Sequence, residues 1–321
     1  MQYIVIGGCS FTINTKDAWG DWVHSRSPND TVFNVASPGA GQGYISRSVI
    51  WKVQELLNSN VKPENIEVIV MWSGMDRHEV LSTNKETTLH SIYQGGVDYA
   101  TWLENFIFIN GHRIPYEESC WLKSSNKNEP WKNRAIRQLF AKYFEWFYTE
   151  EESFLKGLEH ILRLQWFLKC NNIDYKFMSW MNIFNKYEVE VPLNEIGERF
   201  PGTGEKKYGH ELFCMGWFDN NPWSPDRHFP KKLFDKISKD TPLLKDIYPN
   251  TTHLWDMMDW NKWWFYEDEQ IEHGGYAEWI SISEQHAWGN GYRDPGHPSS
   301  YSHEQFYKKV IEPIIEEFNE I

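Results

Sequence analysis

Three short β-forming runs separated by helical segments constrain the fold of this chain more than any other feature of its sequence. Residues 3–6, 31–35 and 66–72 are rich in Val, Ile and aromatic residues, and each run leads into a turn containing glycine or serine. Residues 46–57, between the last two runs, place apolar side chains along one helical face. Strands and helices that alternate in this way are typical of a parallel sheet covered by helices. The sequence therefore predicts an α/β fold with a central, mostly parallel sheet.

The second half of the chain is predicted to complete the same domain. Helical patterns cover about 131–148 and 150–170, and a fourth strand is predicted at 174–180. Residues 185–250 are rich in Pro, Gly, Asn and charged side chains, and we interpret them as an insertion or lid. We therefore predict one α/β domain over residues 1–321 with a large, aromatic-rich insertion.

Two helices carry local signals of their orientation and boundaries. One side of the helix predicted at 150–170 is apolar and is expected to face the core; it carries Leu155, Leu158, Leu162 and Trp166. In the last helix, Ser302 has the capping-box spacing that marks a helix start. We therefore expect Trp166 to be buried and the last helix to begin near Ser302.

The charge balance excludes several classes of partner. The chain carries 32 basic and 45 acidic residues, which leaves a formal net charge of −13. Binding to a nucleic-acid backbone needs clustered Lys and Arg, which this sequence lacks, so nucleic acid is not an expected partner. No apolar run approaches the roughly 18 residues of a membrane-spanning helix, so we expect no membrane partner either.

The N-terminus, the cysteines and the histidines predict a reducing compartment and no cofactor. A secretory signal consists of a basic segment followed by an apolar stretch, and the first residues show no such pattern. The cytoplasm is therefore the expected location. The four cysteines are scattered without a CxxC pair, which predicts neither a zinc ribbon nor a disulfide framework. The 12 histidines show no HExxH or comparable spacing. We therefore expect neither a metal ion nor another cofactor.

Four polar segments follow predicted strands or precede the last helix, where an α/β sheet places its ligands. Ser10 follows the first strand in Gly-Cys-Ser-Phe-Thr, and Gly39 lies in the glycine-rich loop after the second. Asp76 follows the third strand, and Asp294 with His297 precedes the last helix. Taken singly, Ser10 is explained by a local turn and the Asp294 segment by a polar Pro-Gly loop. The Asp-x-x-His spacing also suits a general base with its orienting carboxylate.

The order of these segments resembles the SGNH (GDSL-like) hydrolase superfamily. Gly-Cys-Ser-Phe-Thr at residues 8–12 matches the nucleophile block of that superfamily, and residues 34–39 look like its second block. Gly-Met-Asp at 74–76 stands where the third block is expected, and Asp-Pro-Gly-His-Pro at 294–298 fits the Asp-x-x-His-Pro block. The residues of these blocks are also similar to those of SGNH-like proteins of marine bacteria and phages. A phage origin would imply that the protein is located in the host cytoplasm.

The resemblance implies a three-layer α/β/α fold and a serine-esterase mechanism. Ser10 would be the nucleophile, His297 the general base and Asp294 the residue that orients the imidazole. The main-chain N–H groups of Ser10 and Gly39 would form the oxyanion hole. No cofactor is implied, and the substrate would be a small-molecule or glycan ester.

Two residues depart from the superfamily pattern. Cys9 replaces the Asp of Gly-Asp-Ser, which leaves the nucleophile and its turn glycine in place. Asp76 replaces an Asn whose side chain donates to the oxyanion, and an ionised carboxylate only accepts hydrogen bonds. We therefore expect either that Asp76 pairs with Arg77, or that Ser73 or Arg77 replaces the missing donor.

The aromatic residues bear on the substrate. The chain contains 18 tryptophans, and they are densest between residues 255 and 288. Core packing explains such residues, and so does a flat wall for a sugar. Trp72 and Trp288 are the candidate substrate-binding residues. We expect an esterase that removes O-acyl groups, chiefly acetyl, from a glycan. An O-acyltransferase with the same residues and a non-catalytic glycan-binding protein on the same scaffold remain open.

Overall fold

The computed structural model describes part of the chain, in stretches that include all four predicted strands of the sheet. These stretches are residues 1–13, 17–37, 39–75, 77–81, 106–110, 149–185, 188–189, 207–208, 241–269, 271–283 and 298–319. The helix predicted at 131–148 and most of the insertion predicted at 185–250 lie outside the described residues.

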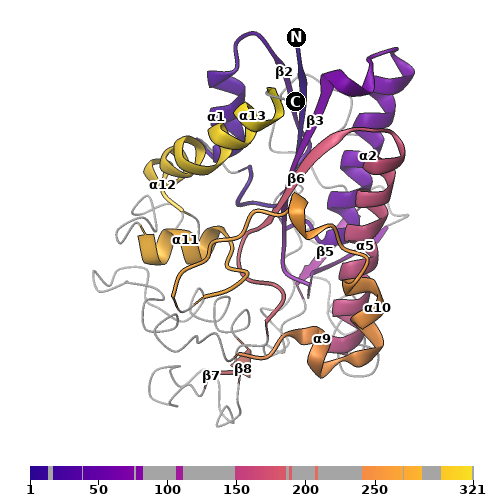
Figure 1. The fold of residues 1–321 in the computed structure, drawn as a ribbon, viewed down its shortest axis with the longest axis vertical. Helices are drawn as coiled ribbons and strands as arrows, with labels where there is room; N and C mark the ends of the chain where they lie inside the picture. The colour runs from indigo at the N-terminus through magenta and orange to yellow at the C-terminus, as the bar shows by residue number, and fades with distance from the viewer. Residues whose placement is uncertain are drawn as a thin grey trace, which may run out of the picture.

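Four parallel strands form the central sheet in the order β2-β1-β3-β6 (Figure 1). They are β1 (Tyr3–Gly7), β2 (Thr31–Asn34), β3 (Ile66–Trp72) and β6 (Asp174–Ser179). Each observed strand differs from its predicted range by at most one residue. The predicted α/β fold with a parallel sheet is therefore confirmed.

The strand order decides on which side of the sheet each helix lies. The chain passes from β1 through α1 (Trp19–Arg26) to β2, and then returns past β1 through α2 (Gln42–Asn58) to β3. Parallel strands are joined by right-handed crossovers, so connections that run in opposite directions put their helices on opposite faces. Figure 1 shows α2 beside α5 (Glu150–Cys170) on one side of the strands, and α1 with the C-terminal helices on the other.

The C-terminal helix runs through three consecutive parts. They are α12 (Ser300–Phe306), a π-helical turn (Tyr307–Ile311) and α13 (Glu312–Asn319). The hydroxyl of Ser299 caps this helix, because it accepts the main-chain N–H of Ser302 at 3.2 Å. The helix therefore begins near Ser302, as predicted, but its capping residue is Ser299, three residues before the predicted cap.

The remaining described elements are short helices, 3₁₀ turns and strands. The strands form two small two-stranded sheets that are separate from the central sheet. β4 pairs antiparallel with β5, and β7 pairs antiparallel with β8. The bounds are β4 (Arg77–Leu81), β5 (Phe106–Asn110), β7 (Glu188–Val189), β8 (Lys207–Tyr208), α9 (Leu244–Ile247), α10 (Thr252–Trp255), α11 (Tyr276–Ser283), and the 3₁₀ turns η1 (Pro63–Asn65), η4 (Pro249–Thr251) and η5 (Trp260–Lys262).

The buried side of α5 differs from its predicted side at one residue. Leu158 and Leu162 are fully buried, as expected, but Trp166 is 47% exposed. Four residues span slightly more than one helical turn, so a row of residues four apart drifts around the helix axis. By Trp166 the drift has carried the side chain out of the buried face, and the prediction for this residue was wrong.

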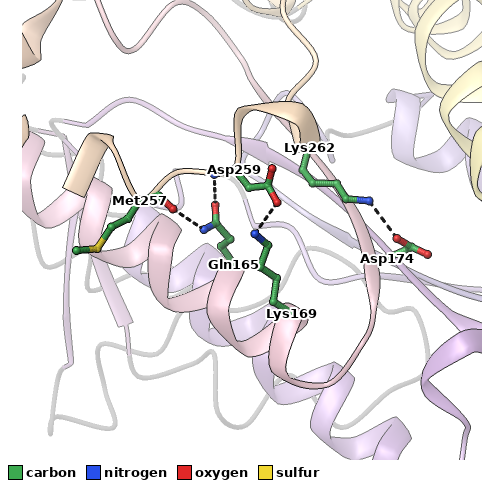
Figure 2. A network of polar contacts seen from close by, with 6 residues as sticks. All are labelled: Gln165, Lys169, Asp174, Met257, Asp259 and Lys262. Atoms are coloured by element: carbon green, nitrogen blue, oxygen red, sulfur yellow. Dashed lines mark hydrogen bonds and ion pairs between the residues drawn. The ribbon is translucent and has the colours of Figure 1, made fainter. Parts of the chain in front are cut away.

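Polar contacts fasten the segment around η5 to α5 and β6 (Figure 2). The side-chain amide of Gln165 accepts the N–H of Asp259 at 2.8 Å and donates to a main-chain carbonyl of the same segment at 2.9 Å. Lys169 forms an ion pair with Asp259 at 2.6 Å, and Lys262 forms one with Asp174 of β6 at 3.1 Å. Because Gln165 is buried and both ends of its amide are bonded, these contacts define one seating of the segment on α5.

Phe184, on the loop after β6, lies inside a cluster of tryptophan rings. Its ring centroid lies 5.3 Å from those of Trp255 and Trp260 and 5.1 Å from that of Trp263, and all three pairs meet edge to face. This geometry is favoured by the charge distribution of aromatic rings. Trp255 and Trp263 are 8% and 6% exposed. For these two tryptophans, the structure supports core packing.

Glu67 places a carboxyl group inside the sheet. It lies on β3, is 3% exposed, and neither carboxyl oxygen has a hydrogen-bond partner among the described residues. Burial, and then the nearby charges of Asp30 and Asp174, raise the pKa of Glu67 to about 7. The folded protein therefore holds this proton at a pH where the unfolded chain has lost it.

We predict that Glu67→Gln raises the free energy of unfolding above pH 7 by roughly 2 kcal/mol, because the amide never ionises. In the wild type the pKa of this carboxyl is raised on folding. Its contribution to stability is therefore complete at pH 4 and is lost as the pH rises to about 7. The difference between variant and wild type should accordingly vanish near pH 4. Urea unfolding at pH 4 and pH 8 measures it, and equal stabilities at pH 8 would contradict the account.

Glu278 on α11 is the matched comparison. Its pKa is also raised to about 7 by burial, but its carboxylate accepts the main-chain N–H groups of Asn182 at 3.0 Å and Gly275 at 2.8 Å. Glu278→Gln turns an amide N–H toward these donors. This mismatch offsets the gain from removing an ionisable group whose pKa is raised. The rise in the free energy of unfolding at pH 8 should therefore be smaller than for Glu67→Gln by about 1–2 kcal/mol.

Candidate functional site

The carboxyl ends of β1 and β3 form the place where the sheet is expected to bind a ligand. These strands are neighbours, but the chain leaves β1 toward β2 and leaves β3 toward β6. Open parallel sheets bind ligands in the crevice outside such a reversal of direction. Gly7 pairs with Val70 at the end of the ladder, so Ser10 and Ser73 each lie three residues beyond it.

Ser10 occupies a single tight turn after β1. The carbonyl of Cys9 accepts the N–H of Thr12 at 3.0 Å, which closes the turn around Ser10. A Cβ atom on Gly8 would lie 2.0 Å from the Thr12 hydroxyl oxygen, so the turn requires glycine there. Ser10 is 8% exposed, and no hydrogen bond joins it to another described residue. Its hydroxyl and its N–H are therefore not committed to any described partner.

The loop after β2 is bonded to the loop after β1. The N–H of Ser37 donates to the carbonyl of Gly8 at 3.1 Å, and the N–H of Ala40 donates to Ser37 at 3.0 Å. Gly39 lies inside this turn with φ of 82°, a conformation that favours glycine. Its N–H makes no hydrogen bond with the other described residues. The structure thus brings the loops of Ser10 and Gly39 together through main-chain contacts.

Gln42, which the sequence analysis missed, joins this loop to the end of β3. Its side-chain oxygen accepts the N–H of Ser73 at 3.2 Å and the Ser73 hydroxyl at 3.4 Å, and its side-chain nitrogen donates to the Ser73 carbonyl. Gln42 is 2% exposed. The one sequence signal for it is a polar residue at a helix start directly after the glycine loop. Because its N–H and hydroxyl both bond Gln42, Ser73 is a poor substitute for an oxyanion donor.

The turn after β3 is held from α5. The carbonyl of Met75 accepts the hydroxyl of Ser153, and a Cβ atom on Gly157 would lie 2.1 Å from the Met75 sulfur. The N–H of Arg77 donates to the carbonyl of Gly74 at 3.3 Å and closes the turn. Both neighbours of position 76 are therefore anchored, while Asp76 itself lies outside the described residues.

Arg77 and Trp180 meet beside this turn. The guanidinium carbon of Arg77 lies 5.4 Å from the ring centroid of Trp180, and Trp180 lies 4.5 Å from the ring of Phe11. Nη1 of Arg77 is buried and has no hydrogen-bond partner among the described residues. Of the two proposed substitutes for the third-block donor, Arg77 is the one with a free N–H group in the described part of the chain.

The two ends of the segment that contains Asp294 and His297 are tied together. The hydroxyl of Tyr276, on α11, and Nδ1 of His303, on α12, lie 2.8 Å apart in a hydrogen bond. Both side chains are buried. Asp294, His297 and the candidate Trp288 themselves lie outside the described residues.

Trp72, the other candidate substrate-binding residue, lies inside the sheet. It is fully buried, and its ring meets that of Phe177 edge to face at 5.4 Å. Its carbonyl accepts the N–H of Trp180 at 2.9 Å, which extends the β3–β6 pairing by one residue. The sequence leaves Trp180, like Trp72, open between core packing and a wall of the substrate cleft. In the structure, the guanidinium of Arg77 lies over the ring of Trp180.

Neither a scan against protein-family models nor a search of curated proteins finds a match for this chain. In the described residues, no helix has the length and apolarity needed to cross a membrane. Across the same stretches, no group of His, Cys, Asp and Glu side chains could hold a metal ion.

We predict that Gln42→Ala lowers the free energy of unfolding by about 3 kcal/mol, because it leaves the buried N–H and carbonyl of Ser73 without partners. Chemical denaturation measures the change. Gln54→Ala is the matched control on the same helix, since the exposed Gln54 donates to the side chain of Asn58 at 3.0 Å. That control should stay within about 0.5 kcal/mol of wild type, and equal losses in the two variants would disprove the bridging role of Gln42.

Proposed function

We propose that this protein is a serine esterase of SGNH type that removes O-acyl groups, chiefly acetyl, from a glycan. One observation supports it most: Ser10 follows β1 at the reversal of chain direction, with no described partner for its hydroxyl or N–H. The helices on either side of the sheet in Figure 1 fit the three-layer α/β/α arrangement that this class of enzyme would have.

The proposed reaction proceeds through an acyl-enzyme. His297 takes the proton of the Ser10 hydroxyl as the oxygen attacks the ester carbonyl, and Asp294 stabilises the imidazolium that forms. The N–H groups of Ser10 and Gly39 donate to the oxyanion. The imidazolium then protonates the departing sugar oxygen, and water hydrolyses the acyl-Ser10 ester by the same steps in reverse. Transfer of the acyl group to a second sugar hydroxyl would make the same protein an acyltransferase.

A fluorophosphonate should add once to the wild-type protein and should not add to Ser10→Ala. An activated serine displaces fluoride from phosphorus, and alanine has no oxygen to do so. Intact-protein mass measures the adduct. The fold should survive the substitution, because the Ser10 hydroxyl bonds no described residue, and thermal unfolding checks this.

Ser37→Ala and Cys9→Ala are the matched controls for labelling. Ser37 lies on the neighbouring loop and Cys9 is the buried residue before the nucleophile, so both variants should keep the adduct. An adduct that survives Ser10→Ala would exclude Ser10 as the nucleophile. Absence of any adduct on folded wild type would favour a non-catalytic glycan-binding protein.

Asp294→Asn should reduce turnover by up to about 10⁴-fold, because an amide favours the wrong tautomer of His297. Acetate release from an aryl acetate measures the loss. Asp246→Asn is the control, since this carboxylate is exposed on α9 and pairs there with Lys245. If Asp294→Asn turns over as fast as wild type, Asp294 does not orient the base.

A further inference from the structure

We propose that Arg77 binds a carboxylate on the substrate, so that the preferred esters are those of an acidic sugar; this substrate class rests on the esterase function proposed above. Four observations carry it: the position of Arg77 after β3, its stacking on Trp180, the rigid support of that ring, and its unbonded Nη1.

The position of Arg77 places a cation at the same edge of the sheet as Ser10. The Gly74–Arg77 turn follows β3, and the Ser10 turn follows the neighbouring strand β1. Adjacent strands lie about 4.8 Å apart, which is within the reach of an arginine side chain. A contact chain also links the two turns, since Arg77 stacks on Trp180 and Trp180 packs against Phe11, the residue after Ser10.

Trp180 gives the guanidinium a rigid platform. Its N–H donates to the carbonyl of Trp72 at 2.9 Å, and its own carbonyl accepts the N–H of Ala277 at 2.7 Å. Two residues later, the N–H of Asn182 is held by the Glu278 carboxylate. Trp180 is 1% exposed. A guanidinium held on such a surface loses little conformational freedom when it binds a ligand.

The unbonded N–H group points to an anion as the ligand. Nη1 of Arg77 is buried without a hydrogen-bond partner in the described stretches, and no carboxylate of those stretches forms an ion pair with it. A buried, unbonded donor costs free energy, which a ligand can recover. Arginine stays cationic in proteins, and its planar fork matches a carboxylate with two parallel hydrogen bonds. A uronate-type sugar presents that group beside its acylated hydroxyls.

The test compares two acetylated sugars that differ in one group. The acetylated methyl glycoside of glucuronic acid carries a free carboxylate at the position where acetylated methyl glucoside carries a neutral substituent. We expect kcat/KM for acetate release by the wild type to favour the acidic sugar by about tenfold or more, as for a hydrogen bond to a charged group. Arg77→Gln should reduce this ratio to about one, and Arg77→Lys should restore part of it, because lysine supplies the charge without the fork.

Arg26→Gln is the matched control. Arg26, on α1, stacks on Trp22 at the same 5.4 Å, and it is exposed at the end of α1 away from the site. This variant removes one positive charge, as Arg77→Gln does, and should keep the wild-type ratio. If Arg77→Gln lowers kcat/KM equally for both sugars, Arg77 acts as an oxyanion donor, and the carboxylate assignment is overturned. A ratio of kcat/KM values that is unchanged in Arg77→Gln would also overturn the assignment. That result is expected if the Asp76 carboxylate binds the Arg77 guanidinium.

Binding measured without turnover separates the two proposals. Calorimetric titration with the methyl glycoside of glucuronic acid and with methyl glucoside should show about tenfold tighter binding of the acid to wild type and no such preference in Arg77→Gln. A binding preference without acetate release would support the Arg77 site and contradict the esterase. Acetate release that depends on Ser10 but is equally fast for the acidic and the neutral sugar would support the esterase and overturn the Arg77 site.

Discussion

The parallel pairing of β1 with β3 is the constraint on which the rest of the structure depends. β2 lies on the other side of β1, so the chain must turn back between β2 and β3. Right-handed connections then force α1 and α2 onto opposite faces, and the carboxyl ends of β1 and β3 are left open beside each other. Ser10 and the Ser73–Arg77 turn share this edge for that reason.

Main-chain N–H and C=O groups just beyond a strand end have no hydrogen-bond partner within the sheet. In this structure, buried side chains form hydrogen bonds with them. The amide of Gln42 bonds the N–H and carbonyl of Ser73, and the carboxylate of Glu278 bonds the N–H of Asn182 after β6. Unbonded groups at these depths would be costly. The same bonds hold the loops in one position. A site that stabilises a developing charge depends on donors that do not have to move during the reaction.

The buried tryptophans pack in more than one place. Around Phe184, the rings of Trp255 and Trp263 are nearly inaccessible to solvent and fill the space beyond β6. Trp180 is equally buried, but one face of its ring meets the guanidinium of Arg77. A cation also lies over the ring of Trp255, since Lys245 Nζ is 5.5 Å from its centroid.

The sequence by itself determined the strands, α5 and the location of Ser10, because these depend on local signals: runs of β-branched residues, helical spacing and a glycine turn. It mispredicted Trp166, where helical drift of about 40° per four residues decides the outcome, and the cap at Ser299, where one turn of helix does. Only the tertiary structure revealed the contacts of Gln42 with Ser73 and of Glu278 with Asn182. These residues lie 31 and 96 positions apart, and no local pattern encodes a hydrogen bond that forms only once the strands have paired.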